Sequence, residues 1–150
     1  MKKIFSFLSA GTLLAAMVFV TGCSRNQEKV KETPQLEDKV FVVNIVHDSL
    51  KLNEYLHYHK QIWPQVEAGF KKAGYRKIVL YRYDYLLVMK ITVPVGADLG
   101  EMGKLAEASD PRCAEWNKIM NNYQQGVPGT SPGQTWVEAK PFYEFSHPAE

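Results

Sequence analysis

The sequence predicts an α+β domain of the ferredoxin-like type, in which a four-stranded antiparallel sheet carries helices on one face. Strand-like and helix-like hydrophobic spacings alternate along the chain in the order β-α-β-β-α-β. The two middle strands are separated by a short turn, and both crossovers contain helical segments. This is the element order of a split βαβ sandwich, whose second sheet face has no helices to cover it.

The first half of the domain is predicted as one strand followed by two consecutive helices. Residues 40–46 form a short apolar run rich in β-branched side chains, which favours a strand. Asp48 offers an N-cap for a helix over 50–62. Pro64 cannot donate a backbone hydrogen bond, so the first helix is expected to end before it and a second to cover 64–73.

The middle of the domain is predicted as a hairpin and a second helical crossover. Residues 76–83 and 85–93 alternate in polarity and are joined by a tight connection. A helix is expected over 98–108, with an aspartate as its cap, and another restarts at Pro111.

The C-terminal part is predicted as a loop over 124–134, rich in glycine and proline, and a final strand over 136–145. Residues 147–150 are expected to form a frayed tail after the domain, 39–146. The strands hold more aromatic residues than solvent-facing positions usually do, so the uncovered face is expected to pack against a second subunit or to roof over a ligand. These aromatic residues include Tyr81, Tyr83 and Phe142.

The N-terminus predicts an exported lipoprotein. Two lysines precede an uncharged apolar run over 4–20, as in an export signal, although its length is also near that of a membrane span. The run ends in Val-Thr-Gly-Cys, which resembles a bacterial lipobox with Cys23 as the lipidated residue. We therefore expect a signal peptide over 1–22, a lipidated cysteine with a polar tether over 23–38, and anchoring to a membrane of the bacterial cell envelope.

Composition argues against several other classes of protein. The formal net charge is +2 and basic residues are scattered, so nucleic acid is not an expected partner. Lipidation of Cys23 would leave Cys113 without an intramolecular disulfide partner. His57 and His59 diverge on a helix and no carboxylate is spaced to join them, so a metal site is not expected. The sequence has no phosphate-binding loop, and no other cofactor is expected.

The helical stretch over 54–64 contains the candidate active site. Tyr55 and His59 are four residues apart, so a phenol and an imidazole lie on the same side of one helix. His59 also belongs to a series with alternating spacings of four and three, which marks the core-facing side. The series is Leu52, Leu56, His59, Trp63, Val66 and Phe70. A histidine in such a series is also compatible with a hydrogen-bonded core residue.

The segment Tyr-x-x-x-His-x-x-x-Trp-Pro, which begins at Tyr55, resembles the signature of the L-rhamnose mutarotase family, and we take the resemblance to cover residues 40–145. It implies a dimer of ferredoxin-like subunits that interconverts the anomers of a reducing sugar. It also implies that His59 is the acid acting at the sugar ring, with Tyr55 in the same site.

A second segment, over 110–120, is similar to another block of that family and contains Trp116. The family usually has two consecutive tryptophans there, whereas this chain has Asn117 in the second place. It departs again at Ile78, where the family pattern has a tyrosine in the site. Sugars pack their C–H faces on aromatic rings, so Trp63 and Trp116 are candidate substrate contacts, with plain core packing as the alternative.

The first hypothesis is an aldose mutarotase-like isomerase for L-rhamnose or a related 6-deoxy sugar. An envelope-tethered sugar-binding lipoprotein without catalytic activity is the alternative, suggested by Ile78 and Asn117. Fold analogy alone adds small monooxygenases and haem-degrading enzymes.

Overall fold

A computed structural model describes residues 34–147. The predicted signal peptide, Cys23 and most of the tether lie outside these residues. The elements, in chain order, are β1 (Leu36–Ile45), α1 (Ser49–Lys60), α2 (Pro64–Ala73), β2 (Lys77–Tyr83), β3 (Leu86–Pro94), α3 (Leu99–Glu107), α4 (Pro111–Asn121), β4 (Gln124–Gln125) and β5 (Val137–Glu138).

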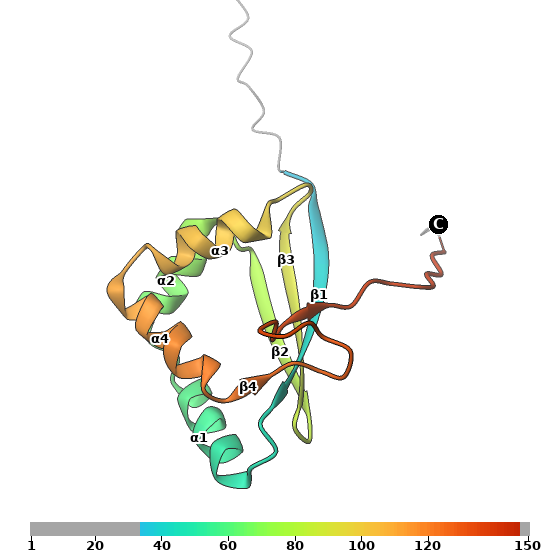
Figure 1. The fold of residues 1–150 in the computed structure, drawn as a ribbon. Coiled ribbons are helices and arrows are strands. Elements are labelled where there is room, and N and C mark those ends of the chain that lie inside the picture. Colours follow the sequence, from blue (N-terminus) through green and yellow to red (C-terminus); the bar gives the residue numbers. More distant parts are fainter. Residues whose placement is uncertain (1–33, 148–150) are drawn as a thin grey trace, which may run out of the picture. The chain divides into compact units, whose positions relative to one another are not determined.

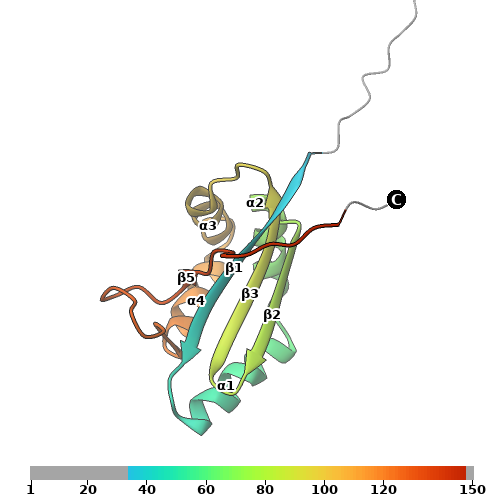
Figure 2. The same ribbon diagram turned by 90° about the vertical axis from the view of Figure 1, so that its right-hand side faces the viewer.

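The sheet has the predicted antiparallel topology. Its strand order is β2-β3-β1-β4, and β5 also pairs with β1. The four helices lie on one side of the sheet (Figure 1), and the opposite face is turned toward the viewer in Figure 2. The ferredoxin-like prediction is therefore confirmed, with β1 and β3 in the centre and β2 at an edge.

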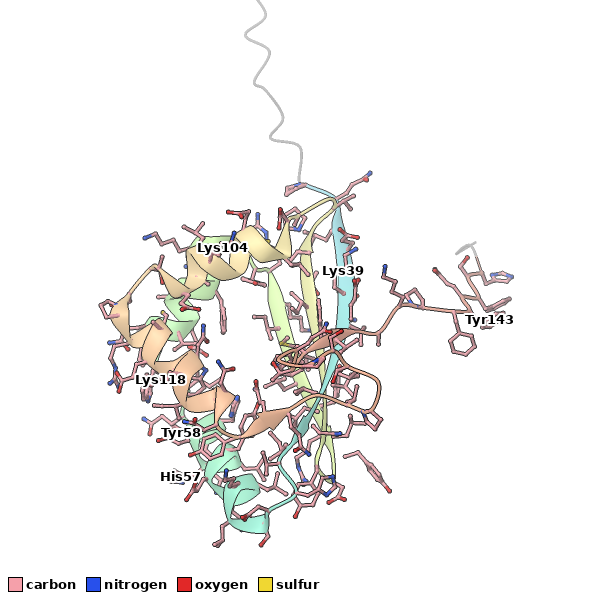
Figure 3. The ribbon with its side chains drawn as sticks, in the orientation of Figure 1. Lys39, His57, Tyr58, Lys104, Lys118 and Tyr143 are labelled. Atoms are coloured by element: carbon pink, nitrogen blue, oxygen red, sulfur yellow. The ribbon has the colours of Figure 1, made fainter. Side chains whose placement is uncertain are left out.

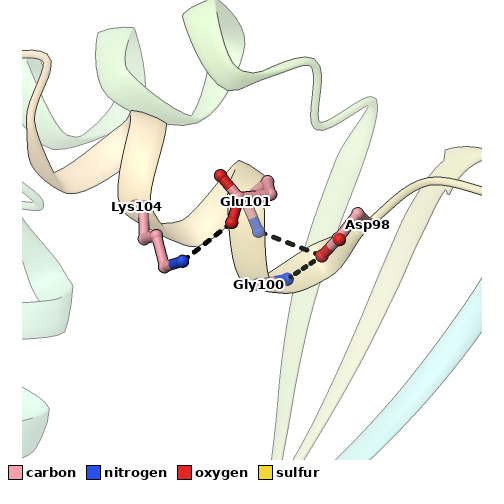
Figure 4. Close-up of polar contacts among 4 residues, drawn as sticks. All are labelled: Asp98, Gly100, Glu101 and Lys104. Carbon is pink, nitrogen blue, oxygen red and sulfur yellow. Dashed lines mark hydrogen bonds and ion pairs between the residues drawn. The ribbon is translucent and has the colours of Figure 1, made fainter.

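Aspartate caps and prolines set the helix starts, as the sequence predicts. The Asp48 carboxylate accepts hydrogen bonds from the first backbone N–H groups of α1, and Asp110 caps α4 in the same way. Asp98 accepts from the N–H groups of Gly100 and Glu101 at the start of α3 (Figure 4). Each such bond satisfies a donor that has no partner inside the helix. The break at Pro64 ends α1 at Lys60 and starts α2.

The core lies between the helices and the covered sheet face. Val43, Ile45 and Leu87 are almost completely buried, and Trp116 and Met120 of α4 pack in the same cluster. These residues keep the period of two along the strands and the helical spacing along α4.

The predicted final strand over 136–145 is wrong in its extent. Only Val137–Glu138 pairs with β1, followed by one hydrogen bond from the Ala139 N–H to the Val40 carbonyl. Pro141 has no N–H to continue the ladder. The chain after β5 leaves the sheet on the side away from the helices (Figure 1), and Tyr143 projects from it (Figure 3). The predicted loop over 124–134 also begins with a short strand, β4.

The register decides which residues of the edge strand β2 face the helices. Ile78 pairs with the buried Ile91, whereas Tyr81 pairs with Val88. Because neighbouring residues alternate between the faces, Ile78 lies on the helix side and Tyr81 and Tyr83 on the open side. Tyr81 and Tyr83 are 55% and 82% exposed.

Within residues 34–147, no helix combines the length and apolarity needed to cross a membrane.

Candidate active site

A cavity of about 1130 Å³ lies between the helix layer and the covered face of β2 and β3. Tyr55 and His59 contribute to it from α1, and Trp116 from α4. The floor includes Ile78, Leu80, Leu87 and Met89 of the sheet. The predicted phenol and imidazole, one turn apart on α1, therefore both line one cavity.

Tyr55 and His59 lie against each other in α1, with ring centroids 4.1 Å apart. His59 Nδ1 lies 2.9 Å from the Tyr55 carbonyl oxygen. A carbonyl oxygen only accepts hydrogen bonds, so Nδ1 carries the ring hydrogen and donates a hydrogen bond to this oxygen. In the neutral ring, Nε2 therefore has a free lone pair and is the nitrogen that could accept a proton.

Burial shifts both groups toward their neutral forms. It lowers the pKa of His59, and the hydrogen bond to the Tyr55 carbonyl opposes this only in part. Burial raises the pKa of Tyr55 to about 12, against a smaller lowering by a hydrogen bond with Gln124. Near pH 7 the site therefore pairs a neutral imidazole, which can accept a proton, with a phenol that keeps its own.

The two predicted tryptophans occupy different positions. The indole of Trp116 lines the cavity, and its centroid lies 5.4 Å from that of His59. Trp63 is not part of the cavity wall; its ring packs edge-on against Trp116 at 5.4 Å and carries the Arg112 guanidinium 3.5 Å from its centroid. Trp63 therefore packs against the side of Trp116 that faces away from the cavity.

Asn117 and Ile78, where this chain departs from the family pattern, both line the cavity. Asn117 Nδ2 donates to Glu107 Oε2 over 2.8 Å, which holds that amide against α3. Ile78 contributes an aliphatic surface on the helix side of β2.

The structure adds two site residues that sequence patterns missed, Gln124 and Trp136. Both line the cavity, and Trp136 Nε1 donates to Gln124 Oε1 over 3.1 Å. Gln124 directly follows the segment after α4, and Trp136 precedes β5, so no helical or strand period connects them. Pairing of β4 and β5 with the same strand, β1, brings them together.

The other histidines lie elsewhere. His47 stacks on Tyr85 with centroids 4.4 Å apart, and His57 is exposed on α1. Within residues 34–147 no group of three or more His, Cys, Asp and Glu side chains could hold a metal ion.

Fold and cavity together define a small ferredoxin-like protein with a phenol–imidazole pair in a cavity lined partly by aromatic rings. The sequence model for L-rhamnose mutarotase matches residues 39–145. The chain therefore belongs to the L-rhamnose mutarotase family, as the signature segment predicted.

Individual relatives agree with this assignment. The L-fucose mutarotase of Xanthomonas campestris pv. campestris is 32% identical over 109 residues, which are 71% of this chain and 86% of that protein. The L-rhamnose mutarotase of Escherichia fergusonii is 30% identical over 94 residues, 63% of this chain and 86% of that protein. The crystal structure of an L-rhamnose mutarotase from Formosa agariphila is similar in fold, with a TM-score of 0.50 at 18% identity, covering 73% of this chain and 99% of that one.

Proposed function

We propose that the protein is an aldose mutarotase, which interconverts the anomers of L-rhamnose or a related 6-deoxy sugar such as L-fucose. Family membership and the names of the two relatives support the reaction class. The observation that carries the proposal is the Tyr55–His59 pair, which shares an aromatic cavity with Trp116.

Mutarotation requires two coupled proton transfers. When the ring opens, the ring oxygen gains a proton, the anomeric hydroxyl loses one, the bond from the anomeric carbon to the ring oxygen breaks, and a carbonyl forms. After rotation about the adjacent C–C bond, closure on the other carbonyl face reverses both transfers. No electrons are exchanged with another molecule, and each well-placed transfer contributes about 10²–10⁴ in rate.

The protonation states support one assignment of roles. Neutral His59 accepts the anomeric hydroxyl proton on Nε2, and the Tyr55 hydroxyl donates to the ring oxygen. The resemblance implies instead that His59 is the acid at the ring, which requires an imidazolium that burial disfavours. The two assignments predict opposite pH dependences.

Gln124 supports the donor role of Tyr55. The hydrogen bond between Gln124 and Tyr55 lowers the pKa of the phenol, as expected if the Gln124 amide nitrogen donates to the Tyr55 oxygen, while Gln124 Oε1 accepts from Trp136. With its oxygen accepting from Gln124, the phenol keeps its own hydrogen available for donation to a sugar.

Magnetisation transfer between anomer signals in NMR spectra tests the proposal. Added protein should accelerate exchange of L-rhamnose or another member of a 6-deoxy sugar panel, and His59→Asn should abolish the acceleration. Unchanged exchange for every sugar would reject the activity. Saturable binding without faster exchange would also contradict it, in favour of a sugar-binding module.

A homodimer is proposed as the functional assembly. The open sheet face carries exposed Tyr81 and Tyr83, and the chain after β5 presents exposed Phe142, Tyr143 and Phe145. Monomers rarely leave this much aromatic surface in water. Sedimentation should give twice the monomer mass for the domain, and deletion of residues 141–150 should shift it toward monomer; a monomeric intact domain would contradict the assembly.

Anchoring in the bacterial cell envelope is likewise proposed, on the lipobox-like residues that end at Cys23. Labelled palmitate should be incorporated into the full chain in a bacterial host and not into Cys23→Ser. Equal release of both proteins into the aqueous fraction would refute the anchor.

A further inference from the structure

The cavity extends beyond the acid–base pair. Arg82 pairs with Leu87, which belongs to the core cluster with Tyr55. Ile78 lies four residues earlier on the same strand and also lines the cavity, so the two positions are about 13 Å apart at 3.3 Å per residue. A cavity of about 1130 Å³ with this extent has room for more than one pyranose ring.

The end of the cavity remote from Tyr55 is rich in positive charge. Lys71 and Arg76 both line it. Lys71 stands in the last turn of α2, and Gly74, at φ 96°, turns the chain back so that Arg76 begins to pair with β3 through Thr92. This turn places the cations of a helix end and of a strand start at the same rim.

These cations lack acidic partners. In the part of the chain that the structure describes, no ion pair joins Lys71 or Arg76 to a carboxylate. Of the carboxylates in the wall, Glu107 accepts from Asn117, and Glu67 makes no ion pair.

An aromatic surface adjoins the cations. Phe70 and Tyr75 line the same end, with ring centroids 5.6 Å apart in an edge-to-face arrangement. The Tyr75 N–H donates to the Phe70 carbonyl and the Gly74 N–H to the Lys71 carbonyl, so the polar end of α2 is satisfied by its own turn. Rings for the C–H face of a sugar thus stand beside unpaired cations for an anionic group.

We propose that this end of the cavity, at Lys71, Arg76 and Tyr75, binds an anionic sugar residue attached to the sugar whose anomers are exchanged. The substrate class is an acidic disaccharide or short oligosaccharide with a free reducing end. Its carboxylate or sulfate lies at the cationic end and its reducing end at Tyr55 and His59. The inference rests on the proposed mutarotase activity and specifies its substrate.

The test compares free-reducing disaccharides with the same reducing sugar and different non-reducing residues. One residue is a neutral hexose, one a hexuronate and one a sulfated hexose, and L-rhamnose alone is included. Exchange at the reducing end should show a kcat/KM about tenfold higher for at least one anionic disaccharide than for the neutral one at low ionic strength, and added salt should reduce the difference. The carboxylate and sulfate arms identify the anionic group.

Substitutions then locate the effect. Lys71→Gln with Arg76→Gln should remove the preference for the anionic disaccharide. Lys72→Gln removes one positive charge from a neighbouring exposed position that does not line the cavity, and should keep the preference. The preference is the ratio of kcat/KM for the anionic disaccharide to that for the neutral one, measured on one preparation. A smaller fraction of folded protein lowers both values equally and leaves the ratio unchanged.

Two outcomes would overturn the inference while the activity stands: equal kcat/KM for neutral and anionic disaccharides, or a preference that persists in the Lys71→Gln, Arg76→Gln variant. Failure to accelerate exchange of any sugar, L-rhamnose included, would instead reject the proposed function itself.

Discussion

Replacement of His59 by asparagine tests the acid–base pair most directly. The asparagine amide nitrogen can take the place of Nδ1 as donor to the Tyr55 carbonyl, 2.9 Å away in the native protein, while nothing replaces Nε2. The helix and the packing of Tyr55 should therefore persist, and the proton acceptor alone is removed.

The expected loss is that of one general base, about 10²–10⁴ in kcat, or roughly 2.7–5.4 kcal/mol of transition-state stabilisation. Tyr55→Phe keeps the aromatic packing and removes the donor, so it should cost a similar factor. Because the two groups act on the same event, the double variant should lose little more than either single variant.

The pH profile separates the two possible roles of His59. Burial lowers its pKa below the ordinary 6.5, so the neutral base dominates above that value. The rate of enzymatic exchange should rise with pH up to a plateau reached below about pH 7. It should then stay level well into the alkaline range, because the pKa of Tyr55 is about 12. Magnetisation transfer at each pH, corrected for buffer-catalysed exchange, gives this profile.

Full activity of His59→Asn would refute the reasoning, because no acceptor then remains on residue 59. A wild-type rate that declines as pH rises through 6.5 would also refute it, and would show that the imidazolium is the active form, as the family resemblance implies.

Further predictions concern orientation and stability. Gln124→Leu removes the hydrogen bond to Tyr55 and frees its hydroxyl to turn, so it should lower kcat about tenfold with little change in KM. Gln125→Leu, at the exposed neighbouring position, should keep kcat, and equal effects of the two substitutions would contradict the orienting role. Gly69→Ala should destabilise the protein by about 1–3 kcal/mol in urea unfolding, because the new Cβ would lie 2.9 Å from the Ala106 carbonyl oxygen. Gly103→Ala, whose Cβ would have nothing within 4 Å, should instead stabilise helix α3 by about 0.5–1 kcal/mol. A stabilising Gly69→Ala would show that α2 and α3 can move apart. Below pH 6.5 the unfolded chain binds a proton at His59 more readily than the folded protein does, so the free energy of unfolding should decrease as the pH is lowered from 6.5. His59→Asn should flatten this part of the plot of stability against pH. Identical plots for the two proteins would mean that burial does not shift the pKa of this histidine.

Local patterns in the sequence predicted most of the fold. Pro64 marked the break between α1 and α2, and the aspartate caps marked the helix starts, because both act on the backbone within a few residues. The last strand was overestimated because alternation over 136–145 predicts a strand even where no partner continues the ladder. Pairing ends after Glu138, and the aromatic residues beyond it are exposed.

Some features of the candidate site could be predicted from the sequence, and others could not. The helical period alone placed Tyr55 and His59 together, and the signature around them led to the family. Sequence spacing could not separate Trp116, which lines the cavity, from Trp63, which packs behind it under Arg112. Each lies at a position compatible with the core-facing side of its own helical segment. Only the packing of α2 against α4 shows which of the two lines the cavity.

By itself, the sequence determined the β-α-β-β-α-β order of the main elements, the helix starts and the phenol–imidazole pair, because each depends on residues that are close along the chain. The tertiary structure alone decided that Gln124 and Trp136 join that pair, that burial holds both groups neutral, and that Lys71 and Arg76 share a rim with Tyr75. These features arise where β4, β5 and the end of α2 meet the sheet, and contacts between segments distant in sequence leave no periodic pattern in the chain.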